Sequence, residues 1–220
     1  MTEEKKTFFI NATRNYRPFG MLMHAARSLG EIGQSGQKGS GWANVGGLVL
    51  LAFGIEAFCQ EQGPKLFEEA WPGADGVERK PVHAKLKLIG AKLGVVVDYG
   101  KHPWSDIRAL LRVRDSLAHP KPSDDQKIVQ LMLDDEEQAN LRATNVILQP
   151  WEVMSEPAHA AKIEENVRAA METLLVAMGT NKWEMEFLGS GSYSMSTGQS
   201  SQGSSGPSPK PAQRRLPADD

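Results

Sequence analysis

Apolar residues recur at helical spacing along much of this chain, most clearly between residues 107 and 118. There they fall on one helix face, and Pro120 and Pro122 follow, where a helix must end. The same spacing predicts four more helices, over residues 18–32, 48–60, 82–93 and 157–178. The second of these is apolar nearly all round, which is typical of a central buried helix. The pattern therefore predicts an all-α bundle of about five helices.

The remaining stretches have no clear helical period. Residues 127–133 and 145–154 are apolar enough for two strands, so one interpretation is a small β-hairpin insertion, although the first also fits a short helix. From residue 189 onward the chain is rich in Gly, Ser, Pro and Gln and cannot bury enough apolar surface to fold. The sequence thus predicts a flexible N-terminus over 1–14, a helical domain over 15–188 and a disordered tail over 189–220.

Net charge and cysteine content bear on two questions, whether the chain binds nucleic acid and whether it contains a disulfide. The net charge of −2 gives no overall basic field for nucleic acid, although a local basic patch would suffice. The single cysteine, Cys59, excludes an internal disulfide, and its place on an apolar helix face predicts a buried thiol. Four lysines are expected on the exposed side of the helix near residues 82–93, namely Lys80, Lys85, Lys87 and Lys92.

No targeting segment is expected. The charged first residues are not followed by the apolar region of a signal peptide. The longest apolar stretch, residues 45–59, is shorter than a membrane span and contains Glu56. The sequence therefore predicts a soluble cytoplasmic protein with no membrane association.

Arg114 stands on the apolar face of its predicted helix. A guanidinium cannot lose its proton, so Arg114 needs an anionic partner or an opening to solvent. His119 follows five residues later and is of the one side-chain type that titrates near neutrality unaided. On a regular helix the two would point about 140° apart. Either Pro120 pushes His119 out of the helix, or a second chain supplies one of the two groups.

The run Arg114-Asp115-Ser116-Leu117-Ala118-His119, at the end of a late helix, resembles the signature of the HEPN superfamily. Residues 51–60 also look like the second helix of several members. The resemblance implies a HEPN-like helical bundle and RNA cleavage that needs no metal and no cofactor. The ribose 2′-hydroxyl would attack the adjacent phosphorus while His119 moves the proton. Arg114 would bind the phosphate and stabilise the added negative charge, and Asp115 would orient the substrate. The resemblance further implies a homodimer, RNA as substrate, and an antitoxin or effector partner protein in a toxin or defence system.

Three further residues are candidates for this site. Glu56 is either a carboxylate at the solvent edge or a partner that orients Arg114 or His119. Lys38 and Lys121 are predicted to contact RNA phosphates. Lys38 lies in the Gly-rich stretch 33–47, which is expected to be a flexible connection because it lacks the lysine signature and the preceding strand of a phosphate-binding loop.

Other chemistries are disfavoured. The five histidines are scattered with no helical pair at metal-ligand spacing, so no metal site is predicted. No nucleophile elbow accompanies Ser116, which disfavours a serine hydrolase. Two hypotheses remain. In an endoribonuclease, Arg114 and His119 would line an open, positively charged groove. In a non-catalytic helical interaction module, Arg114 would be buried against an Asp or Glu without a cleft, and His119 would cap the helix.

Overall fold

The computed structural model describes residues 7–73, 75–120, 148–186 and 189–198. Helices dominate these residues, which confirms the predicted all-α class. The helices are α1 (Pro18–Gly33), α2 (Ser40–Phe67), α3 (Val82–Leu93), α4 (Trp104–Ala118), α6 (Pro150–Met154) and α7 (Pro157–Ala177). Short 3₁₀ turns are η1 (Glu68–Ala70), η2 (Val77–Arg79) and η3 (Lys182–Met185). The helices form one compact unit over Asn15–Ser190.

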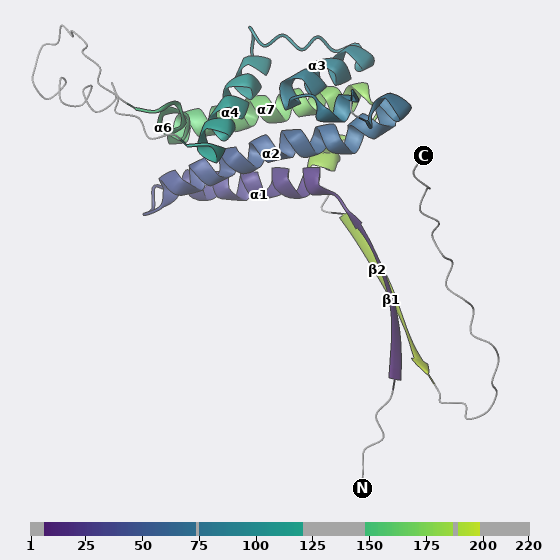
Figure 1. Cartoon of the computed structure of the whole chain (residues 1–220). Coiled ribbons are helices and arrows are strands. Elements are labelled where there is room, and N and C mark those ends of the chain that lie inside the picture. The colour runs from purple at the N-terminus through teal and green to yellow at the C-terminus, as the bar shows by residue number, and fades with distance from the viewer. Residues whose placement is uncertain (1–6, 74, 121–147, 187–188, 199–220) are drawn as a thin grey trace, which may run out of the picture. The chain divides into compact units, whose positions relative to one another are not determined.

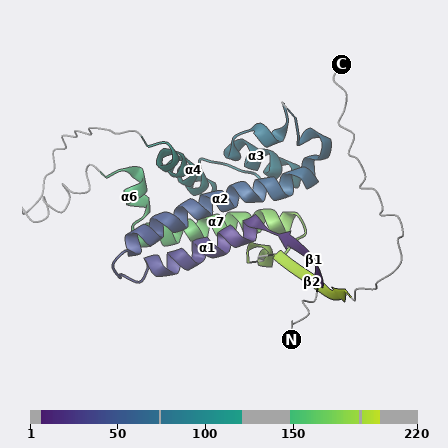
Figure 2. The same cartoon turned by 60° about the horizontal axis from the view of Figure 1, so that its bottom comes forward.

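Helix α2 lies at the centre of the helical unit. It packs against α1, α3, α4 and α7, and α1 lies along it in both views of the molecule (Figures 1 and 2). Its inward side chains include the best-buried residues of the core, at 0–1% exposure: Leu51, Ala52, Ile55, Phe58 and Cys59. The predicted central buried helix is therefore confirmed.

Helix α2 begins earlier than the sequence indicates. Residues 40–47 are helical, so the prediction that 33–47 is a flexible connection is wrong for its second half. Gly47 explains the difference, because it lets α1 and α2 approach closely. A Cβ on Gly47 would stand 3.1 Å from the carbonyl oxygen of Ala26 on α1. The packing gained by that approach outweighs the low helix propensity of glycine.

The full length of α2 also changes the membrane argument. By length and composition this helix is long and apolar enough to cross a membrane. The prediction that the longest apolar stretch is shorter than a membrane span is therefore wrong. Half of its most apolar window is buried inside the protein. Burial of this kind is expected of the core helix of a helical bundle.

Two strands stand where the sequence predicts unfolded chain. β1 (Thr7–Tyr16) and β2 (Gly189–Gly198) pair in a two-stranded sheet, so the flexible N-terminus and the start of the disordered tail are corrected there. The cause is non-local, because each strand supplies the backbone partners of the other. The rest of the predicted tail, 199–220, lies outside the described residues.

Only the second of the two strands predicted for the β-hairpin can be compared with the structure. Residues 127–133 lie outside the described part of the chain. Residues 150–154 form helix α6 rather than a strand. A capping box starts this helix, in which Gln149 and Glu152 exchange side-chain and backbone contacts. Local capping therefore decides the conformation where hydrophobic content alone could not.

The predicted exposure of two titratable side chains, Cys59 on α2 and Lys85 on α3, can be compared with the structure. Cys59 is fully buried, as predicted, and burial raises the pKa of its thiol to about 12. Lys85 was expected on the exposed face of α3 but is only 4% exposed. Its ammonium lies 5.7 Å from the centre of the Trp71 ring, a cation–π contact that covers the long side chain.

Glu186, just after η3, ties the end of the helical unit to α1 and α7. Its Oε1 accepts hydrogen bonds from Arg27 Nη1 at 2.9 Å and Arg168 Nη1 at 3.0 Å, and its Oε2 lies 3.3 Å from His24 Nδ1. Partial burial alone would raise the pKa of Glu186. The hydrogen bond with His24 and the charges of Arg168 and Arg27 outweigh that effect and hold the pKa below its ordinary value of 4.5.

This cluster generates a pH-dependent prediction. Because the folded-state pKa of Glu186 is lowered, its contribution is fully present above 4.5 and is lost as pH falls through the lowered value. Glu186→Gln should reduce the free energy of unfolding by about 1 kcal/mol near neutral pH. Urea unfolding of both proteins should show this difference shrinking in acid. Glu78→Gln, at an exposed carboxylate, is the control; an equal effect of both substitutions would contradict the role of Glu186.

Candidate functional site

Arg114 projects from α4 toward α2 and meets Glu56 there. Arg114 Nη1 donates a hydrogen bond of 2.7 Å to Glu56 Oε2. The Arg114 side chain is 15% exposed and that of Glu56 is 37% exposed. Of the two roles left open for Glu56, the geometry is that of a partner that orients Arg114.

A second carboxylate lies beside the same guanidinium. Arg114 Nε stands 2.8 Å from Asp115 Oδ1, which is an ion-pair distance. Yet the buried Nε has no hydrogen bond among the described residues. Consecutive residues on a helix do not face each other, so the N–H and the oxygen are close but poorly aligned. Asp115 is 64% exposed, and its contact is therefore weak compared with that of Glu56.

Phe53 completes the surroundings of Arg114. The guanidinium carbon lies 5.6 Å from the centre of the Phe53 ring, in a cation–π contact. Phe53 is three residues before Glu56, so both stand on one face of α2. Sequence reasoning missed Phe53, although its spacing from Glu56 was the available signal. The aromatic ring and the carboxylate together hold the cation at the edge of the core.

His119 ends α4. Its backbone leaves the helical region at φ −129° and ψ 59°, immediately before Pro120, as predicted. Its backbone N–H donates to the carbonyl oxygen of Asp115 at 3.1 Å. The imidazole is exposed and has no hydrogen-bond partner within the described part of the chain.

Of the two predicted RNA-contacting lysines, only Lys38 lies among the described residues. Lys38 is exposed in the turn before α2, and the helix begins at Ser40. Glu56 is sixteen residues further along, which corresponds to about 24 Å of helix. A lysine side chain cannot span that distance, so Lys38 does not contact Arg114 or Glu56 of the same chain, and its contact with an RNA phosphate stays a prediction. Lys121 lies outside the described residues.

The charge around Arg114 disfavours an anionic ligand. Its single positive charge faces the carboxylates of both Glu56 and Asp115. A phosphodiester would bring a further negative charge to a place where negative charge already prevails. Arg114 and His119 do not line three of the cavities formed by the described residues, among them the two cavities described below.

The largest of these cavities lies between the start of α4, α6 and α7. It has a volume of about 890 Å³, and its wall includes Val153, Met154 and Ile163. Asp106 stands at its edge, where it receives Asn166 Nδ2 at 2.6 Å and His102 Nδ1 at 2.8 Å. Within the described residues, no group of three or more His, Cys, Asp or Glu side chains could hold a metal ion.

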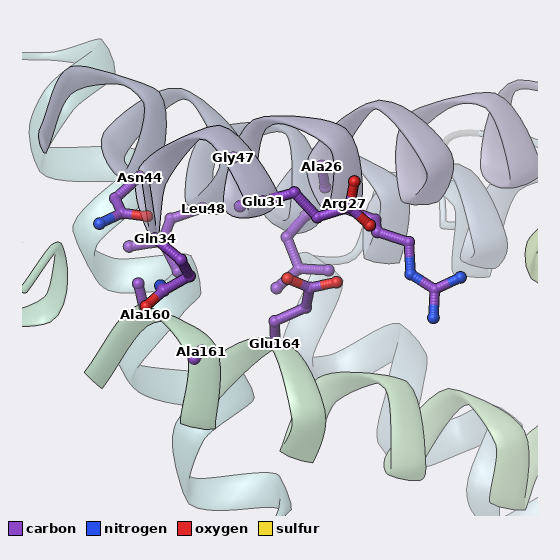
Figure 3. A pocket seen from close by; sticks show the side chains of 12 residues that line it. Ala26, Arg27, Glu31, Gln34, Asn44, Gly47, Leu48, Ala160, Ala161 and Glu164 are labelled. Atoms are coloured by element: carbon purple, nitrogen blue, oxygen red, sulfur yellow. The ribbon is translucent and has the colours of Figure 1, made fainter. Parts of the chain in front are cut away.

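A smaller cavity of about 240 Å³ lies between α1, α2 and α7 (Figure 3). Leu51 on α2 helps to line it. Phe53 is two residues further and about 200° around the helix axis, so this cavity and the Arg114 contact lie on opposite faces of α2. The lining includes Glu31, Gln34, Asn44 and Glu164, none of which the sequence had singled out.

Comparison of the chain with protein-family models, with curated proteins and with solved structures finds no match. The resemblance to the HEPN superfamily therefore stays a prediction based on residues 114–119 and 51–60.

The Arg114–Glu56 contact can be measured by a double-mutant cycle. Alanine at both positions, singly and together, should give a coupling free energy of about 1 kcal/mol in urea unfolding, reduced from that of a buried pair because Glu56 reaches water. The matched control is the Lys162–Glu165 pair on α7, at 2.8 Å and more than half exposed, whose coupling should be near zero. Equal coupling in the two pairs would show that Arg114 is not held by Glu56.

Proposed function

We propose that this chain is a non-catalytic helical interaction module that acts in the cytoplasm. The observation that carries the proposal is the hydrogen bond from Arg114 to Glu56, with Phe53 against the same guanidinium. A cation in this setting stabilises the packing of α4 on α2. Phosphate binding would require the guanidinium to leave both the ring and the carboxylate, at a cost that the ligand must offset.

An exposed aromatic surface at the start of α2 supports the interaction role. Trp42 is 72% exposed and stacks on Trp151 of α6, with ring centres 6.0 Å apart. Val153, on the same short helix, is 39% exposed. Tryptophan is enriched where proteins bind partners because one side chain buries a large apolar area there. A partner protein is the occupant that this surface favours.

One observation favours the second candidate, an endoribonuclease. The His119 imidazole is exposed and without a hydrogen-bond partner among the described residues, and Arg114 and Asp115 stand on the preceding turn. Such an imidazole is able to move a proton. In this reading RNA is the substrate, a homodimer brings two motifs together, and an antitoxin or effector partner controls the enzyme.

RNA cleavage by the purified chain separates the two candidates. Wild-type protein, His119→Ala and Arg114→Ala are incubated with mixed-sequence single-stranded RNA. His83→Ala, at another exposed histidine, serves as the control. The interaction module predicts that all four proteins cleave at the same background rate.

A loss of RNA cleavage in His119→Ala would overturn the proposal of a non-catalytic module. Loss of cleavage by about 100-fold or more in His119→Ala, with His83→Ala unchanged, is the size expected for removal of a general acid or base. Products ending in a 2′,3′-cyclic phosphate would then identify attack by the 2′-hydroxyl. His119 is exposed, so its replacement should not unfold the chain and the comparison stays interpretable.

A further inference from the structure

The cavity between α1, α2 and α7 has the size of a small ligand. Its volume of about 240 Å³ corresponds to roughly eight molecules of liquid water. Small apolar side chains form much of the wall, among them Ala26, Leu48, Ala160 and Ala161. Figure 3 shows the polar side chains gathered between α1 and α7, with Asn44 and Gln34 at one end and Arg27 at the other.

Each of the three donor side chains that line this cavity, those of Gln34, Arg27 and Asn44, makes at least one hydrogen bond. Gln34 Nε2 donates to the carbonyl oxygen of Pro157 at 2.8 Å. Arg27 Nη1 donates to Glu186 at 2.9 Å, outside the cavity lining. Asn44 Nδ2 has two hydrogens and donates to two carbonyl oxygens, that of Ser155 at 3.0 Å and that of Gly33 at 3.5 Å.

The amide of Asn44 leaves a buried acceptor without a partner. Asn44 is 1% exposed, and its Oδ1 has no hydrogen bond among the described residues. Both neighbours of Nδ2 are acceptors, so the amide cannot be turned round without losing two hydrogen bonds. In Figure 3 the oxygen is turned toward Gln34 and Leu48 and the nitrogen away from them. The carbonyl dipole therefore presents its negative end to this part of the cavity.

Gly33 is what allows the oxygen to lie there. A Cβ on Gly33 would collide with Asn44 Oδ1, so only glycine leaves room for it. A buried acceptor left unpaired costs about 1–3 kcal/mol, and a positive charge near Asn44 Oδ1 would offset part of that cost.

Two carboxylates add to the negative potential. Glu31 is exposed and makes no ion pair within the described residues. Glu164 Oε1 receives Arg168 Nε at 3.0 Å, whereas Oε2 lies over Gly30, 2.7 Å from where a Cβ would stand. Arg27 and Arg168 are balanced by Glu186 and Glu164, which leaves the charge of Glu31 without a counterion. The lining of the cavity contains the two carboxylates of Glu31 and Glu164 and the one guanidinium of Arg27, so its net charge is negative.

We propose that this cavity binds a small organic cation, an alkylammonium group carried on a short apolar chain. The ammonium lies between Glu31 and Glu164, in the field of Asn44 Oδ1, and its methylene groups pack on the alanines and Leu48. The proposal gives the interaction module a ligand and to that extent rests on the proposed function. It uses the face of α2 opposite Arg114, so either proposal can fail while the other stands.

Isothermal titration calorimetry at constant ionic strength tests the ligand chemistry. n-Pentylamine, 1-pentanol and n-pentanoate share a chain and differ in head group. The amine should bind saturably and at least about tenfold more tightly than the carboxylate. Cadaverine then stands for a free amine, and Nα-acetyl-lysine methylamide for a lysine side chain of a partner polypeptide. The tighter of these two identifies the source of the cation.

Two pairs of variants locate the binding. Glu31→Gln should weaken pentylamine binding about fivefold, whereas Glu78→Gln, which removes the same charge from an exposed site elsewhere, should not. Ala161→Leu fills the cavity and should abolish binding, whereas Ala169→Leu, at another exposed position of α7, should leave it intact.

Three results would overturn the proposal. Absence of saturable heat with the amine would mean that water alone fills the cavity. Equal affinities for amine and carboxylate would contradict the charge argument. Equal effects of Glu31→Gln and Glu78→Gln would place the amine elsewhere on the surface. In each case the Arg114–Glu56 coupling would be unaffected, so the proposed function would be judged separately.

Discussion

Burial of helix α2 is the constraint on which the rest of the helical unit depends. Its apolar residues point in nearly every direction, so the helix needs neighbours on several sides. Helices α1, α3, α4 and α7 supply them. Different faces of α2 therefore meet different neighbours. Glu56 pairs with Arg114 of α4, whereas Asn44 donates to the carbonyl oxygen of Gly33 at the end of α1, and each residue marks a candidate site.

The two sites differ in how their polar groups are satisfied. At Glu56 the carboxylate and Phe53 hold the guanidinium of Arg114, and the combination stabilises the contact of α4 with α2. At Asn44 the amide nitrogen is fully engaged and the oxygen is not. The charge of Arg114 is met by carboxylates, although its Nε lacks a hydrogen bond, whereas the Asn44 oxygen has no partner among the described residues. The cation binding that we propose uses the Asn44 side of α2, away from the motif that the sequence brings forward.

Local patterns predicted most of the helical unit. The apolar spacing around residues 107–118, the stop at Pro120 and the burial of Cys59 depend on neighbours in sequence, and each is confirmed. The strands β1 and β2 depend on pairing between distant segments, which composition cannot indicate. Helix α2 extends through its glycines because α1 approaches there, and that approach is also a tertiary effect. Lys85 was misplaced for the same reason, since the ring that covers it comes from another segment.

The candidate site was predictable only in part. Arg114 on an apolar face required a partner, and Glu56 was among the candidates; the pairing of the two follows from how α4 crosses α2. The acceptor at Asn44 could not be foreseen, because an asparagine in a Gly-rich stretch carries no signal of burial. The central claim, that Arg114 is a structural cation, is tested most directly by NMR of protein labelled with ¹⁵N-arginine during titration with a dinucleotide phosphodiester. The account predicts that the Arg114 Nε–H resonance does not shift. A saturable shift of the Arg114 Nε–H resonance would contradict it.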